Sequence, residues 1–359
     1  MSPLRHAGPL LLALAVAGCG GDVGGAPIPT ADASGPATDG GANGADAAAE
    51  NDASTGSSDA QATMRGAPYP IVFVHGMAGF DTLRPLGATI QYWGDVVDDL
   101  RSRGETVFNV TVPPYDSSEA RSRALETQLL AIRAQTGAAK LNLIAHSQGG
   151  LDARLLVSPN GLQWGDRVQT LVTVSTPHRG TKVADVVAGV GDVLPTAVAD
   201  GVFEGLAKAL QVTVYDLKND PHLRAQLNEL SVEHTTKVFN PKYIDDPRVR
   251  YLSWAGRSNL RPGIGICDGA TFPNKPAKLD VLNPLLATVV AATEWGRPPK
   301  ASDGLVTVES AKWGTFQGCV PADHLDEIGA QDVNGIDLTI FDYPAFYRDI
   351  VAELRAHGD

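Results

Sequence analysis

The chain has 359 residues, enough for two domains or for one α/β enzyme domain with attachments. Its hydrophobic fraction of 43% and charged fraction of 19% are those of a soluble globular protein. The net charge of −12 argues against nucleic acid as a partner.

The N-terminus predicts an export signal. Arg5 and His6 precede the apolar run PLLLALAVAG, which is about half as long as a membrane-spanning helix requires. The run ends in VAGC, which resembles a bacterial lipobox, in which the cysteine is diacylated and becomes the new N-terminus. The alternative is a buried or unpaired cysteine. We therefore expect residues 1–18 to be a lipoprotein signal peptide and Cys19 to carry the lipid.

Residues 19–66 are predicted to form a disordered tether. Between residues 20 and 64 the chain has seven acidic residues and no Lys or Arg, and it consists mostly of Ala, Gly, Asp, Ser, Thr and Pro. Such a segment cannot bury enough apolar surface to offset the entropy lost on ordering. We expect it to keep a catalytic domain, residues 67–359, within roughly 35–40 Å of a membrane.

Beyond the tether, short apolar runs alternate with segments of helical spacing. Strands are expected at residues 69–76, 106–112, 140–146 and 168–176, and helices at residues 89–104, 119–137 and 344–358. This alternation predicts a mostly parallel central sheet with helices on both faces.

The stretch IAHSQGG (144–150) places Ser147 between a predicted strand and a helical segment. Small residues at positions 145 and 149 allow the strand and helix to approach closely, as in a nucleophile elbow, where the serine has a strained backbone. The start of the helix would offer N–H groups to developing negative charge. The pattern A-x-S-x-G is weak evidence by itself, because serines flanked by small residues are also common in helix caps.

Three further motifs fit the same chemistry. VHGMAG follows the first strand, where such hydrolases place an oxyanion-hole donor, so the backbone N–H groups of Met77 and Gln148 are the expected pair. SDGLV contains Asp303 at the end of an apolar segment, and DHLDE contains His324 in a loop. The order Ser, Asp, His is that of the α/β-hydrolase fold.

With these motifs the chain resembles the bacterial true lipases of the Pseudomonas and Burkholderia type over nearly the whole of residues 68–358. The matching stretches are YPIVFVHGMAG, QYWGDVVDDLRSRG, LNLIAHSQGGLDARLL, VSTPHRGTKVADVV, SDGLV and HLDE. The resemblance implies hydrolysis of triacylglycerols or other carboxylic esters. It also implies Ser147 as the nucleophile, His324 as general base and then acid, and Asp303 as the residue that orients the imidazole.

The chemistry of these side chains agrees with the resemblance. A serine hydroxyl is a poor nucleophile until a base takes its proton, and an imidazole is suited to do so near neutral pH. Asp323 and Asp326 flank His324, but a sequence neighbour in a loop rarely reaches round to the same ring, so Asp303 is favoured. Three other histidines are expected to be structural: His75, His146 and His178.

A structural Ca²⁺ is implied by the resemblance, since the family holds one near the catalytic histidine loop through two aspartates and backbone carbonyls. Asp280 and Asp326 fall where those carboxylates are expected, and Ca²⁺ prefers such oxygen ligands. The chain departs from the family at Ala330, where the family has glutamine, and has Gln331 next. Gln331 is therefore the shifted candidate. The alternative is that both aspartates are solvated loop residues.

Two cysteines remain once Cys19 is assigned to the lipid. Cys267 and Cys319 form an even pair in an oxidising compartment, which predicts a disulfide. The family has one bridge, with its first cysteine at a position like Cys267. Its second lies nearer the catalytic aspartate than Cys319 does, so this pairing rests mainly on the number of cysteines.

A helical lid is expected in residues 183–228, which interrupt the alternation of strands and helices. Five apolar residues of the segment 195–211 share one helical face: Val198, Val202, Phe203, Leu206 and Leu210. This face could be ordinary core. By resemblance it is a lid that covers the site in water and turns toward lipid at an interface, and Gly201 and Gly205 would weaken its helix.

Two classes of function follow from the sequence. The first is an exported serine ester hydrolase, anchored by lipid on the periplasmic or cell-surface side of a bacterial envelope or secreted. Within it, triacylglycerols are the expected substrate, and a short-chain carboxylesterase or a phospholipase is the alternative. The second class is a non-catalytic lipoprotein that binds lipid on a hydrolase scaffold. The complete catalytic set favours the enzyme, and the need for a dedicated folding chaperone stays open.

Overall fold

The computed structural model describes most of the chain beyond residue 63. The described residues are 64–79, 82–83, 90–189, 196–209, 221–258, 282–294, 297–329 and 341–359. All of them lie in one compact unit, Ala60–Asp359. The predicted signal peptide, Cys19 and nearly all of the predicted tether lie outside the described residues. None of the described helices is long and apolar enough to cross a membrane.

A six-stranded sheet runs through this unit in the order β4-β1-β5-β6-β7-β8. The strands are β1 (Ile71–Val74), β4 (Val107–Val110), β5 (Leu141–His146), β6 (Val168–Val174), β7 (Arg250–Gly256) and β8 (Thr315–Val320). Every neighbouring pair is parallel, which confirms the predicted sheet. Two short strands, β2 (Thr82–Leu83) and β3 (Ile90–Gln91), form a separate antiparallel pair.

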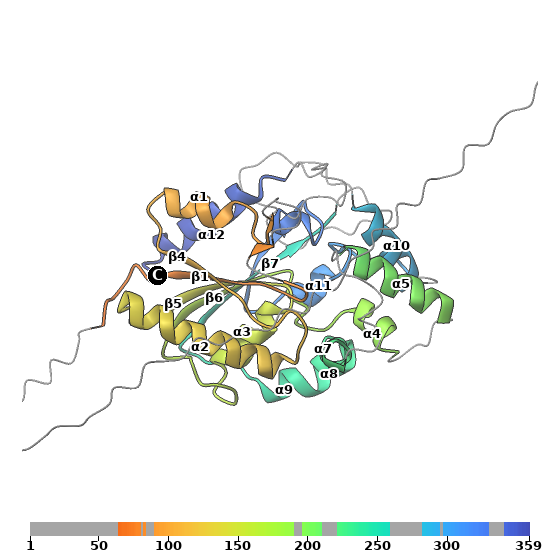
Figure 1. Cartoon of the computed structure of the whole chain (residues 1–359), viewed down its shortest axis with the longest axis horizontal. Helices are drawn as coiled ribbons and strands as arrows, with labels where there is room; N and C mark the ends of the chain where they lie inside the picture. The colour runs from red at the N-terminus through yellow and green to blue at the C-terminus, as the bar shows by residue number, and fades with distance from the viewer. Residues whose placement is uncertain are drawn as a thin grey trace, which may run out of the picture. The chain divides into compact units, whose positions relative to one another are not determined.

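Helices cover both faces of the sheet, as Figure 1 shows. These helices are α1 (Val96–Ser102) and α12 (Tyr343–Ala356) on one face, and α2 (Ser118–Thr136) and α3 (Gly149–Val157) on the other. Successive side chains of a strand point to opposite faces. Phe73 of β1 therefore packs in the core under α1 and α12, while Val72 packs in the core under α2 and α3. Burial on both faces confirms the predicted parallel sheet with helices on both sides.

The helix expected over residues 89–104 is wrong in its first half. α1 begins only at Val96, after the short strand β3 and a turn. Gly94 has a φ of +52°, which a right-handed helix cannot contain. Apolar residues of this segment are buried although they lie in a turn. Trp93, for example, packs edge-on against Tyr347 of α12, with 5.7 Å between the ring centroids.

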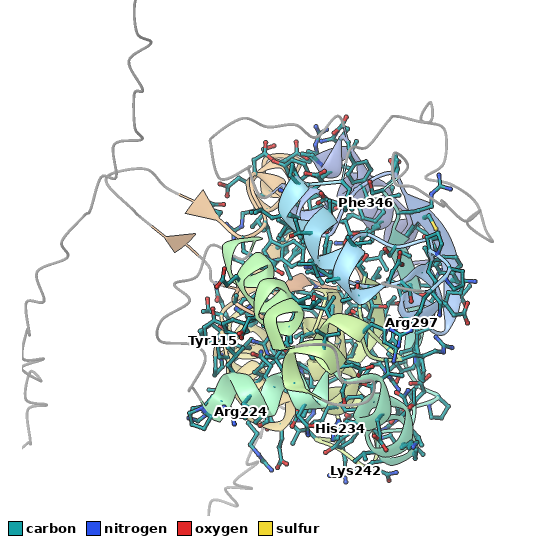
Figure 2. All side chains as sticks on the ribbon, turned by 90° about the vertical axis from the view of Figure 1, so that its right-hand side faces the viewer. Tyr115, Arg224, His234, Lys242, Arg297 and Phe346 are labelled. Carbon is teal, nitrogen blue, oxygen red and sulfur yellow. The ribbon has the colours of Figure 1, made fainter. Side chains whose placement is uncertain are left out.

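Further helices lie beyond the sheet, mostly between β6 and β7. They are α4 (Lys182–Ala188), α5 (Thr196–Ala209), α7 (Pro221–Glu229), α8 (Val232–His234), the π-turn η2 (Thr235–Phe239), α9 (Asn240–Lys242), α10 (Pro284–Thr293), α11 (Val308–Ala311) and the 3-10 turn η3 (Asp326–Ile328). Figure 2 shows α5 and α10 side by side, and Val202 of α5 is buried with Val289 of α10. The role of residues 183–228 as a lid stays a prediction.

Candidate active site

Ser147 lies in a sharp turn between β5 and α3. Its φ is +55°, a left-handed conformation that is uncommon for a residue with a side chain. Close packing explains the small neighbours. A Cβ on Gly149 would lie 2.7 Å from the backbone oxygens of Val74 and His75, and a Cβ on Gly76 would lie 2.6 Å from the Cβ of Ser147. The turn therefore has the geometry of a nucleophile elbow.

Three predicted residues form one hydrogen-bonded row. His324 Nε2 lies 3.0 Å from Ser147 Oγ, and His324 Nδ1 lies 2.7 Å from Asp303 Oδ2. The other carboxylate oxygen of Asp303 accepts from the backbone N–H groups of Leu305 and Val306 at 2.8 and 2.6 Å. Asp303 and His324 are both buried. A base in this position can take the serine proton, and the carboxylate holds the ring in the matching tautomer.

The competing acid Asp323 has a different task. Its carboxylate accepts from the backbone N–H groups of Asn283, Leu325 and Asp326 at 2.8, 2.9 and 3.1 Å. These bonds hold the loop that carries His324 and tie it to the segment before α10. Asp323 is therefore a buried loop residue, and the carboxylate that bonds the ring is that of Asp303.

The two predicted oxyanion donors lie in segments that pack on Ser147. The carbonyl oxygen of Gly76 accepts from His75 Nδ1 at 2.9 Å and from Arg121 Nη2 at 3.2 Å. In a trans peptide the C=O and the next N–H point in opposite directions, so the Met77 N–H points away from Arg121. Gln148 caps α3. Within the described residues neither backbone N–H has an acceptor, so both can receive a ligand oxygen.

The neutral ring of His75 supports the loop that carries Met77, residues 74–79, which we call the oxyanion loop. Its Nε2 accepts from the N–H of Val112 at 3.1 Å, which leaves the proton on Nδ1 to be donated to Gly76 O. Burial and then the charge of Arg121 lower the pKa of His75 to about 4. The ring therefore keeps one proton at neutral pH, and that proton fixes the peptide before Met77.

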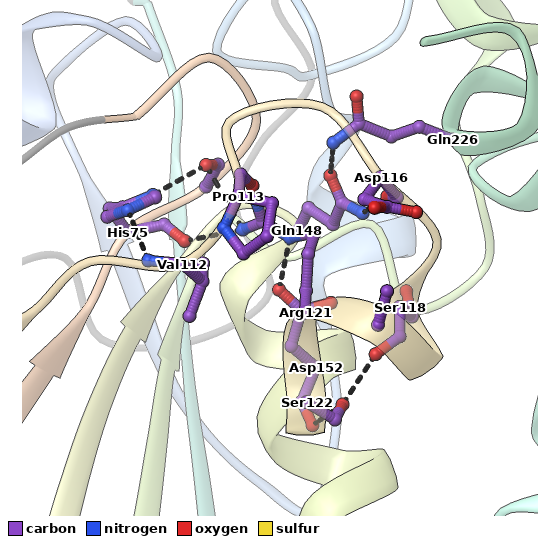
Figure 3. A network of polar contacts seen from close by, with 12 residues as sticks. His75, Val112, Pro113, Asp116, Ser118, Arg121, Ser122, Gln148, Asp152 and Gln226 are labelled. Atoms are coloured by element: carbon purple, nitrogen blue, oxygen red, sulfur yellow. Dashed lines mark hydrogen bonds and ion pairs between the residues drawn. The ribbon is translucent and has the colours of Figure 1, made fainter. Parts of the chain in front are cut away.

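A buried arginine joins the oxyanion loop to α3, as Figure 3 shows. Arg121 Nη2 donates to His75 O at 2.9 Å, Arg121 Nη1 donates to Pro113 O, and Arg121 Nε donates to Asp152 Oδ2 at 2.7 Å. Both charged side chains are fully buried. Burial raises the pKa of Asp152 to about 6, and the ion pair with Arg121 opposes that rise.

The sequence did not predict Arg121 or Asp152 as site residues. A signal was present, because Arg121 is one helical turn before Leu125, on the face of α2 that is buried. A charged residue on the apolar face of a helix implies a buried partner of opposite charge, but the sequence does not show that this partner is Asp152. The sequence also did not predict Gln226 of α7 as a partner of Gln148, whose Oε1 accepts from Gln226 Nε2 at 2.5 Å.

The remaining predicted residues are only partly described. Asp326 begins η3, and Cys319 is buried in β8. Asp280, Cys267 and Gln331 lie outside the described residues. Burial first, then the charges of Asp303, Asp323 and Asp326, raise the pKa of Glu327 well above its usual range.

One group of side chains in the described part of the chain is close enough to hold a metal. The ligand atoms of His146, His324 and Glu327 lie within 4.8 Å of one another. Both ring nitrogens of His324 are already hydrogen-bonded, to Ser147 and Asp303. We therefore interpret this group as part of the serine site.

Comparison with known proteins identifies the family of this fold. Residues 69–232 match the α/β hydrolase fold family. A triacylglycerol lipase of Vibrio cholerae is 31% identical over 307 residues, covering 81% of this chain and 86% of the relative. A triacylglycerol lipase of Burkholderia plantarii is 32% identical over 296 residues, covering 72% of this chain and 78% of the relative.

A solved structure has the same fold. The mature Bacillus licheniformis lipase BlEst2 superposes with a TM-score of 0.54 at 19% identity, covering 81% of this chain and 94% of that chain. The fold therefore extends over nearly the whole of that lipase. The chain belongs to the triacylglycerol lipase family of α/β hydrolases and is an ester hydrolase.

Proposed function

We propose that the chain is an extracytoplasmic, lipid-anchored lipase that cleaves the ester bonds of triacylglycerols through a Ser147–His324–Asp303 triad. The row of contacts from Ser147 Oγ to His324 Nε2 and from His324 Nδ1 to Asp303 Oδ2 carries the proposal. The names of the relatives from Vibrio cholerae and Burkholderia plantarii support triacylglycerols as the substrate.

In the first half of the reaction Ser147 is acylated. His324 Nε2 takes the proton of Ser147 Oγ as this oxygen bonds to the ester carbon. The carbonyl oxygen becomes an oxyanion and accepts from the N–H groups of Met77 and Gln148. His324 then gives the proton to the alcohol oxygen, the ester C–O bond breaks, and the alcohol leaves.

In the second half water releases the acid. His324 Nε2 takes a proton from water, whose oxygen attacks the acyl carbon, and the same N–H groups receive the oxyanion. The proton then returns to Ser147 Oγ as the acyl bond breaks. Asp303 stabilises the charged ring in both halves and holds its Nδ1 proton.

Two stabilising features belong to this proposal. A structural Ca²⁺ would be held by Asp280 and Asp326 with oxygen from the Gln331 region, and it would stabilise the loop that carries His324. The two aspartates at family-like positions, Asp280 and Asp326, support it. A disulfide between Cys267 and Cys319 is the second feature. It is supported by the cysteine count, since Cys19 is assigned to the lipid, and by the disulfide state of Cys319.

Membrane attachment and access to lipid rest on the sequence. Cys19 would carry the lipid, the segment 19–66 would act as the tether, and residues 183–228 would act as the lid over the site. The chain would then work on the periplasmic or cell-surface side of the envelope, or be released from it. A dedicated folding chaperone is a further candidate partner.

Covalent labelling tests the proposed nucleophile. A fluorophosphonate should label the wild-type chain in a one-to-one ratio, and the labelled peptide should contain Ser147. Ser147→Ala should remain folded by circular dichroism, take up no label and hydrolyse no ester, because only the nucleophile has been removed. Equal labelling of the two proteins, or ester turnover by Ser147→Ala within tenfold of wild type, would refute this assignment.

The substrate is tested separately with p-nitrophenyl esters of increasing chain length, emulsified triolein and a phospholipid. Triolein hydrolysis is the expected result. Activity confined to short esters would indicate a carboxylesterase, and preference for the phospholipid would indicate a phospholipase. Binding of lipid without hydrolysis or labelling would favour the non-catalytic lipoprotein.

A further inference from the structure

A second hydrogen-bonded chain runs behind the serine site. The N–H of Gly76 donates to Tyr92 Oη at 3.0 Å, and Tyr92 Oη lies 2.8 Å from His146 Nδ1. On its other side His146 Nε2 lies 3.0 Å from Glu327 Oε2. All three side chains are buried. Neither Tyr92 nor Glu327 has a role in the reaction steps given above.

The hydrogen-bonded chain ends at Gly76 on one side and at Glu327 on the other, and each end lies in a segment that carries part of the active site. Gly76 belongs to the oxyanion loop and shares a peptide bond with Met77. Glu327 lies three residues after His324, on the loop that carries the base. Because His146 directly precedes Ser147, the chain joins the oxyanion loop, the nucleophile turn and the histidine loop at one buried point.

The Glu327 end is tied to the sheet. Glu327 Oε1 accepts from Ser175 Oγ at 2.6 Å, and Ser175 Oγ accepts from the N–H of Gly256 at 2.9 Å. Ser175 follows β6 and Gly256 ends β7. The histidine loop is therefore anchored to the rigid carboxyl edge of the sheet.

The positions of the protons follow from these partners. Tyr92 Oη already accepts from Gly76, so its own proton can be donated to His146 Nδ1. The ring proton of His146 then lies on Nε2 and is donated to Glu327. Burial lowers the pKa of His146 well below its usual range, which agrees with a ring that holds a single proton. The ring also contacts the catalytic ring, with 4.5 Å between the centroids of His146 and His324.

We propose that Tyr92 and His146 are positioning residues, which hold the oxyanion donor Met77 and the base His324 in register with each other. The inference rests on the proposed function, because it assigns these side chains to the oxyanion hole and the triad of that reaction. The described hydrogen bonds of their side chains go to Gly76, to each other and to Glu327, and none of these is a reacting group. A displacement of about 1 Å of either half can cost roughly 10² in rate, and buried side-chain networks of this kind maintain such geometry.

Removal of one hydroxyl group tests the proposal against a matched control. Tyr92→Phe removes the hydroxyl group that links Gly76 to His146 and keeps the aromatic ring. Tyr347→Phe removes a hydroxyl from the same aromatic cluster, where it has no hydrogen-bond partner among the described residues. We expect Tyr92→Phe to lower kcat on p-nitrophenyl butyrate by about ten- to a hundredfold at nearly constant KM, and Tyr347→Phe to stay within twofold of wild type.

Active-site titration with a fluorophosphonate gives the fraction of competent enzyme, and kcat is calculated per titrated site. A merely structural role of Tyr92 would lower that fraction and leave kcat per site unchanged, which would overturn the proposal. The same would follow if both Phe variants lost kcat equally. If Tyr92→Phe does not fold, His146→Asn replaces it, because this residue keeps an acceptor near the Nδ1 position and removes the donor to Glu327. The same fall in kcat per site is then expected.

Failure of the proposed function gives a different result. In that case the wild-type chain itself takes up no label and hydrolyses no ester. If only the positioning role is wrong, the wild-type chain is active and Tyr92→Phe matches Tyr347→Phe.

Discussion

Asp303 bonds His324 twice. The side-chain Oδ2 of Asp303 lies 2.7 Å from His324 Nδ1, and the backbone oxygen of Asp303 accepts from the backbone N–H of His324 at 2.9 Å. The second contact does not depend on the carboxylate, so it survives a change of side chain. The loop and the ring orientation are therefore separable in an experiment.

Asp303→Asn should lower kcat by about 10⁴ with little change in the fold, because an amide favours the wrong tautomer of the ring. Hydrolysis of p-nitrophenyl butyrate and circular dichroism measure the two effects. Asp323→Asn is the control, since the described hydrogen bonds of its carboxylate are to backbone N–H groups and none is to the ring of His324. It should lower the free energy of unfolding and leave kcat per folded molecule close to that of wild type. If Asp323→Asn gave the larger loss of kcat per folded molecule, Asp303 would be the wrong acid.

Gly149→Ala should damage the nucleophile turn. Its Cβ would lie 2.7 Å from two backbone oxygens, which cannot move as a side chain can. We expect a loss of about 1–3 kcal/mol in the free energy of unfolding together with lower kcat. Gly201→Ala in α5 is the control, because a Cβ there meets nothing within 4 Å. Alanine in an exposed helix should add about 0.5–1 kcal/mol of stability, as measured by urea unfolding. Equal stability of the two variants would contradict this account.

His178 should make the fold sensitive to acid. Its Nε2 lies 3.0 Å from Thr173 Oγ1, and its Nδ1 faces Arg154 Nη1 at 3.4 Å. Burial, then the charges of Arg154 and Arg179, lower the pKa of His178 well below its usual range. As pH falls below about 6.5, the unfolded chain binds a proton that the folded chain does not. This contribution to stability is therefore present above that pH and is lost below it.

The expected slope for this one group is about 1.4 kcal/mol per pH unit. His178→Asn removes the titrating group and keeps a polar side chain. Urea unfolding at pH 7 and pH 5 should give a smaller loss of unfolding free energy for the variant than for wild type. Identical losses in the two proteins would show that His178 does not contribute.

Calcium should act on stability more than on chemistry. An ion that binds the folded chain alone stabilises it by about 2.7 kcal/mol at a hundred times its dissociation constant. EDTA should therefore lower the melting temperature, and Asp326→Ala should lower it equally and no longer respond to EDTA. A melting curve unaffected by EDTA, with Asp280→Ala as stable as wild type, would leave both aspartates as ordinary loop residues.

Cys19→Ser should release the protein from membranes without loss of specific activity, since the predicted lipid and the site are separate parts of the chain. Fractionation of expressing cells, with ester hydrolysis measured in each fraction, tests this. The matched control is the wild-type chain in the same cells. A variant that still sedimented with the membranes would refute the lipobox interpretation.

The sequence alone predicted four of the six strands of the sheet, β1, β4, β5 and β6, but not β7 and β8. Ser147 follows β5, while Asp303 and His324 lie on either side of β8. Parallel strands bring their carboxyl ends to one edge, so Ser147 after β5 and His324 after β8 are expected to meet there, whereas Asp303 comes from the connection before β8. Local patterns suffice for this, because a strand, a tight turn and a helix start each leave a signal within a few residues.

Only the tertiary structure decided which buried polar side chains support the site. Tyr92 and His146 are 54 residues apart, and His146 and Glu327 are 181 apart. In the sequence Tyr92 is one aromatic residue of an apparent helix. In the structure the positive φ of Gly94 excludes a helix there, and Tyr92 is buried in the core. A buried hydroxyl or carboxyl group is stable only with a partner across the fold. That partner is chosen by packing, which no single stretch of sequence contains.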